Sequence, residues 1–258
     1  MSQTTEIALH SYTLTSDEFS SIPEDQRAAL GLVSFAMSEI NTLAKAYLFF
    51  QHKMTGDEII DVAITLQNGT LLRNWSATIL DFLLLFTDTK KNKSQDVELK
   101  KLFKESADLF LPLKEQSTYK LVKIMRNEVT NHFFLEPAKL NLSFVSENAD
   151  LSLNFHKMQG NNFAPLGGEI MFIGRGNKFG ANLTEKSDIL QLHKDWMDWN
   201  LAAWRWSIRV FDLFVKRLLT ERFPNKKLVT TTHTIPSNLV GYAETFRAPI
   251  FLKTDADL

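Results

Sequence analysis

The chain has 258 residues, of which 44% are hydrophobic and 23% are charged, and its formal net charge is −1. These values are typical of a globular protein that buries roughly three quarters of the surface it exposes when unfolded. The absence of cysteine excludes disulfides, thiol catalysis and cysteine-ligated metal sites. Proteins that bind long nucleic acids nonspecifically usually carry a strong basic excess, which this chain lacks.

The N-terminal residues lack a basic region followed by an apolar run, so we expect no secretory signal. The most apolar stretch, residues 78–86, contains Asp81 and is far shorter than the ~20 residues of a membrane span. We therefore expect a cytoplasmic protein with no membrane partner.

The first half of the chain is dominated by helical periodicity. Residues 1–20 show no sustained period and are expected to form an N-terminal arm. Apolar residues then recur at three- and four-residue steps. This spacing predicts four helices, over about residues 21–53, 55–86 (with an irregularity at Asn68 and Gly69), 96–110 and 116–134.

The pattern changes after Pro137, which is expected to end the fourth helix. Residues 140–145 and 151–155 alternate apolar and polar side chains, as half-buried strands do, and residues 169–173 form a third candidate strand. The glycine-rich residues 174–180 are expected to form a hairpin turn. These features predict a small antiparallel β insert over about residues 138–182.

A last, long helix is predicted over about residues 184–223, because its apolar residues follow a 3-4-3-4 spacing. This seam is expected to be buried and contains Ile189, Leu192, Trp196, Trp199, Ala203, Trp206, Val210 and Leu213. Residues 224–258 contain three prolines and no period, and are expected to form an extended tail. The predicted fold is mainly α: an antiparallel helical bundle over residues 21–223, with a small antiparallel β insert before the long C-terminal helix.

One motif in the fourth predicted helix points to chemistry. Arg126 and Asn127 are followed, after a short gap, by Asn131 and His132. Cleavage of RNA through its own 2′-OH needs a base, an acid and a cation for the charge on the phosphorane. Histidine suits the proton steps, and the planar guanidinium of arginine can hold two phosphate oxygens at once. Asn127 could hold a phosphate oxygen or orient the histidine.

This motif resembles the signature of the HEPN superfamily, whose members are small helical domains and often metal-independent ribonucleases of toxin–antitoxin or abortive-infection systems. The resemblance covers about residues 25–135 and the final helix. It implies Arg126, Asn127 and His132 as catalytic residues, and no metal or other cofactor. We add Lys123, Asn131 and Arg73 as candidate substrate-binding residues; Arg73 begins a second Arg-Asn pair.

The spacing also bears on assembly. On an ideal helix, Arg126 and His132 stand ~9 Å apart along the axis and ~120° apart around it. One chain therefore presents the two side chains only loosely together, whereas a twofold dimer would supply two of each. Members of the family have a composite site at a dimer interface, so we expect a homodimer. The resemblance also implies an RNA substrate and an antitoxin or nucleotidyltransferase partner.

Structural explanations of the same residues remain open. Arg126 could pair with Glu128, and His132 could simply lie at a helix C-terminus, where the dipole favours it. The rival function is a noncatalytic HEPN-like protein that binds a partner protein or a nucleotide.

Overall fold

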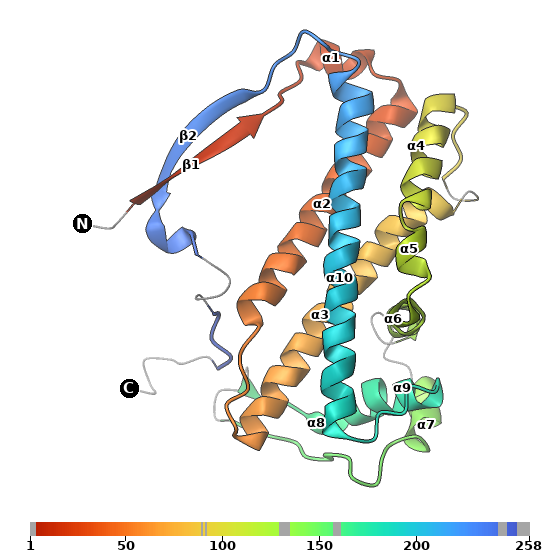
Figure 1. Ribbon diagram of the computed structural model, residues 1–258, viewed down its shortest axis with the longest axis vertical. Helices are drawn as coiled ribbons and strands as arrows, with labels where there is room; N and C mark the ends of the chain where they lie inside the picture. The colour runs from red at the N-terminus through yellow and green to blue at the C-terminus, as the bar shows by residue number, and fades with distance from the viewer. Residues whose placement is uncertain are drawn as a thin grey trace.

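The computed structural model describes residues 4–88, 90, 92–128, 135–156, 161–241 and 247–251, without the side chains of residues 125–128, 137, 186 and 238. Three long helices form the centre of the molecule: α2 (Glu24–Phe50), α3 (Glu58–Thr87) and α10 (Lys186–Val215). The shorter helices α4 (Val97–Asp108), α5 (Leu111–Lys114) and α6 (Ser117–Glu128) cover one side of this bundle (Figure 1). The mainly helical class is therefore confirmed.

The sheet lies in a different place from the predicted one. Strands β1 (Thr4–Ser11) and β2 (Val229–Pro236) pair antiparallel, with Thr4 opposite Pro236 and Ser11 opposite Val229. The two strands form a ribbon that extends away from the helical bundle (Figure 1). Residues that we expected to form an arm and an extended tail thus make the one sheet that the described residues contain.

Short elements join these parts of the chain. Helix α1 (Ser16–Ser21) connects β1 to α2, and a π-helical turn, η3 (Lys216–Thr220), continues α10. A 3-10 turn, η4 (Ser237–Leu239), follows β2.

The predicted β insert is wrong. Its region contains α7 (Leu135–Leu142), α8 (Pro165–Gly168), the π-helical turn η2 (Glu169–Ile173) and α9 (Gly174–Lys178). Its only strand-like contact among the described residues is an isolated bridge between Asn154 and Phe163.

The physical reason is visible in the exposure of the alternating side chains. Leu140 and Leu142 are 57% and 54% exposed, so these residues line no buried sheet face. Gly174–Lys178 form helix α9 instead of a hairpin turn, and Gly180, at φ +84°, follows the C-terminus of this helix.

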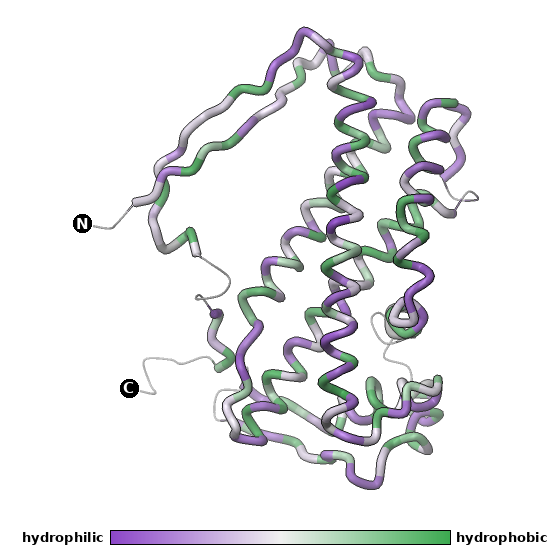
Figure 2. The backbone as a smooth tube through the Cα atoms, in the orientation of Figure 1, coloured by the Kyte–Doolittle hydropathy of each residue, from purple (hydrophilic) through white to green (hydrophobic). Residues whose placement is uncertain are grey.

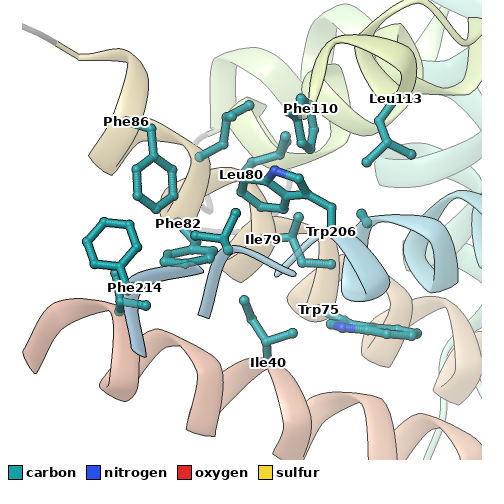
Figure 3. Close-up of a cluster of buried hydrophobic side chains, with 14 of the residues drawn as sticks. Ile40, Trp75, Ile79, Leu80, Phe82, Phe86, Phe110, Leu113, Trp206 and Phe214 are labelled. Carbon is teal, nitrogen blue, oxygen red and sulfur yellow. The ribbon is translucent and has the colours of Figure 1, made fainter. Parts of the chain in front are cut away.

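The middle of the predicted α10 seam is buried, whereas Ile189, Leu192 and Leu213 are only partly buried. Hydrophobic and hydrophilic residues alternate along the long helices (Figure 2), as expected for helices with one buried face. The ring of Trp206 lies 5.3 Å from that of Phe82 and 4.8 Å from that of Phe110 (Figure 3). Five residues of the seam are at most 3% exposed: Trp196, Trp199, Ala203, Trp206 and Val210.

Helix α3 passes through Asn68 and Gly69 without a break, whereas the sequence pattern had suggested an irregularity there. Glycine in a helix interior costs about 1 kcal/mol relative to alanine. A Cβ on Gly69 would lie 3.2 Å from His193 Nε2, so the glycine lets α3 and α10 approach each other closely at this point, and the cost is tolerated for this reason.

No helix in the described part of the chain has the length and apolarity to cross a bilayer.

Candidate functional site

The helix that carries the Arg-Asn pair is packed firmly against the bundle. Val122 of α6 is fully buried, and the ring of Tyr119 lies 5.9 Å from that of Phe110 and 6.2 Å from that of Trp199. Arg126 and Asn127 belong to the last turn of α6, and Lys123 is exposed one turn earlier. The side chains of Arg126 and Asn127, and all of Asn131 and His132, lie outside the described residues.

A cavity of about 950 Å³ lies beside the N-terminal half of α3. Its walls come from the first half of α3, residues 146–154 and 164–168, η2 and the start of α10. In Figure 1 these parts gather at the lower end of the bundle, beside α8. Its volume is within the range of small-molecule binding sites.

One face of α3 forms a continuous wall of this cavity. Its lining residues Ile59, Val62, Leu66, Gly69 and Arg73 follow steps of three and four, so they lie on one side of the helix. Ile59, Val62 and Leu66 thus form an apolar stripe along this wall, with polar side chains beside it, and the guanidinium group of Arg73 lies at its end.

Arg73 is half-buried and has no carboxylate partner among the described residues. Its one hydrogen bond runs from Nη2 to Thr70 Oγ1 at 3.5 Å, which is long, and its buried Nε has no partner. Burial lowers the pKa of Arg73 below its ordinary value because the charged form loses solvation, yet the group stays charged at neutral pH.

His193 of α10 also lines the cavity, next to Gly69 of α3. Its Nδ1 is 2.9 Å from the carbonyl oxygen of Ile189. A carbonyl only accepts, so Nδ1 carries the proton and donates it, which leaves Nε2 as a lone pair in the neutral ring. Burial lowers the pKa of His193, and the hydrogen bond to Ile189 offsets this only in part. The ring is therefore a neutral acceptor at pH 7.

Two carboxyl groups of the lining have different environments. Burial raises the pKa of Glu169, whose Oε1 accepts a 3.3 Å hydrogen bond from the amide of Asp150. Asp61 accepts hydrogen bonds from the backbone of Thr55 and Gly56, so it holds the chain before α3. No three His, Asp or Glu side chains cluster as metal ligands in the described part of the chain.

The structure places the predicted site residues in two regions. Arg73 lines the cavity, whereas the described lining includes no residue of α6. Sequence reasoning did not identify His193 and Glu169 as lining residues, and residues 169–173 were assigned to a candidate strand. The signal for His193 was Gly69: an interior helix glycine often marks a close approach by another element.

The comparisons with known proteins add no relative: no family model, no curated protein and no solved structure matches this chain.

Proposed function

We propose that this protein is a metal-independent endoribonuclease of a toxin–antitoxin or phage-defence system, which cleaves RNA by attack of its own 2′-OH at a composite dimer site. The observation that carries the proposal is the Arg126-Asn127…His132 motif, beginning in the last turn of a helix within a mainly helical bundle. Helix α6 is anchored to the bundle through Val122 and Tyr119, and such rigid support suits catalytic side chains.

The residues of the motif and their neighbours have different roles in the proposed reaction. Arg126 stabilises the negative charge that develops on the scissile phosphate, and His132 removes or returns a proton. Asn127 orients the phosphate or the imidazole. Lys123 and Asn131 contact the RNA backbone nearby.

The segment that follows the motif supports a dimer. Between residues 135 and 155 several large apolar side chains are exposed, and apolar surface of this kind often marks a protein–protein contact. They are Leu135, Leu140, Leu142, Phe144, Leu151, Leu153 and Phe155, with exposed fractions between 41% and 81%. A second copy that covers this segment would bring two motifs close together, and an antitoxin or a nucleotidyltransferase could regulate the same surface.

The decisive experiment uses a labelled RNA and purified protein in the presence of EDTA. We expect cleavage products that end in a 2′,3′-cyclic phosphate, and no cleavage where the attacking nucleotide is 2′-deoxy. His132→Ala should lower the rate by about 10²–10⁴, the range of general acid–base catalysis. Arg126→Ala should also abolish most activity, whereas the exposed-residue controls His233→Ala and Arg205→Ala should cleave like the wild type.

Mixing two inactive variants tests the composite site. If one site uses Arg126 of one chain and His132 of the other, heterodimers of Arg126→Ala and His132→Ala should regain part of the activity. Cleavage that EDTA abolishes, or that survives both substitutions, would contradict the proposal. Equal bacterial growth on expression of the wild type and both variants would favour the noncatalytic rival.

A further inference from the structure

The cavity beside α3 has a chemistry of its own, independent of the ribonuclease motif. From its apolar stripe along α3 and the one arginine of its described lining we infer that it binds a linear acyl carboxylate, with the carboxylate held by Arg73 and the acyl chain lying along α3. This site is separate from the motif, so the two proposals can fail independently.

Apolar side chains of α3, η2 and α10 line much of the cavity. From Ile59 to Arg73 the lining face of α3 spans fourteen residue steps, or ~21 Å at the rise of an α-helix. Met171 of η2 and Leu190 of α10 line the cavity as well. An extended hydrocarbon chain can lie along an apolar stripe of this length, and each methylene that leaves water adds binding free energy.

The polar end of the α3 wall has an unused hydrogen-bond donor in Arg73. Arg73 Nε is buried without a partner, and no ion pair occupies its guanidinium among the described residues. A guanidinium and a carboxylate form two parallel hydrogen bonds, so a carboxylate is the natural complement. The Nε2 atom of His193 meets α3 one turn before Arg73 and is an acceptor, so it offers no hydrogen bond to a carboxylate and leaves Arg73 as the group that holds it.

The charge of the lining decides against a polyanionic ligand. Arg73 is the one arginine or lysine in the described lining, whereas Glu58, Asp61, Asp150 and Glu169 all line the cavity. A nucleoside triphosphate or an RNA strand would meet more negative than positive charge there. A head group with one negative charge matches the single guanidinium.

Isothermal titration of the whole chain with decanoate tests the site. We expect one decanoate per chain, and about tenfold to a hundredfold weaker binding to Arg73→Met, because charge-assisted hydrogen bonds are lost. The matched control Arg205→Met changes an exposed arginine on α10 and should bind decanoate within twofold of the wild type. Decanol, which lacks the charge, should bind the wild type and Arg73→Met alike.

Chain length provides a second measurement that does not depend on a variant. Affinity should rise from octanoate to decanoate to dodecanoate by up to about fourfold for each added methylene. The inference is overturned if decanoate does not bind, if Arg73→Met binds it as tightly as the wild type, or if affinity does not change with chain length. Tighter binding of adenosine monophosphate than of decanoate would also overturn it.

Discussion

A buried hydrogen-bond network between α3 and α10 offers the sharpest test of how this bundle is held together. The hydroxyl of Ser76 lies 2.7 Å from the carbonyl oxygen of Leu72 and 2.8 Å from Oδ1 of Asn200. Its single proton is shared between these two acceptors in a bifurcated hydrogen bond. The indole Nε1 of Trp196 donates to the same hydroxyl at 2.7 Å, and Nδ2 of Asn200 donates to Leu72 at 3.2 Å. Ser76, Trp196 and Asn200 are at most 1% exposed.

Ser76→Ala removes one oxygen and leaves almost the same volume, so its cost comes from hydrogen bonding. The substitution leaves the indole N–H of Trp196 and Oδ1 of Asn200 buried without a partner. Each orphaned group costs about 1–3 kcal/mol, so we expect a loss of about 3 kcal/mol in the free energy of unfolding. For a chain of this size, this loss lowers Tm by roughly 6–12 °C.

Urea unfolding followed by circular dichroism measures this loss, provided that the slope with urea concentration stays constant. Ser38→Ala is the matched control, because Ser38 makes the same hydrogen bond to the carbonyl four residues earlier but is exposed on α2. It should change stability by less than about 0.5 kcal/mol. Ser76→Ala with a stability equal to that of the control would refute the network as a source of stability.

Two further predictions concern the cavity. Arg73→Met should raise the free energy of unfolding of the ligand-free protein by roughly 1 kcal/mol, because a half-buried guanidinium without a partner is replaced by an apolar side chain. Thermal unfolding measures this change, and a destabilised variant would mean that Arg73 supports the fold. His193 should titrate below pH 6.5 in an NMR experiment, since burial lowers its pKa. Because the unfolded chain takes up that proton first, stability should fall as the pH drops from about 6.5 through the folded pKa.

Helical periodicity was sufficient to place the main helices. The predicted segments at about residues 21–53, 55–86, 96–110 and 184–223 correspond to α2, α3, α4 and α10 with η3. Long segments average many apolar positions, so one misplaced side chain does not hide the period. The same periodicity predicted that Trp196, Trp199 and Trp206 of α10 are buried, and the structure confirms it.

The strands were predicted in the wrong place because short alternation carries little information. Five or six residues that alternate apolar and polar side chains also occur in helices and loops, as residues 140–145 and 151–155 do here. The strands that do form are separated by more than two hundred residues, and threonines dominate β2. A pattern within one short segment cannot predict that the segment pairs with a strand so far away in the sequence.

Some features of the candidate site could be predicted from the sequence, and others depend on the tertiary structure. The order of residues alone identified the Arg126…His132 motif, and it named Arg73 as a residue that could bind substrate. Only the packing of α10 on α3 brought His193 to the helix face that Arg73 shares with Gly69. Periodicity determines which face of a helix is buried, whereas the partner of that face depends on how all the helices pack at once. This is why the helices could be predicted from the sequence and the cavity could not.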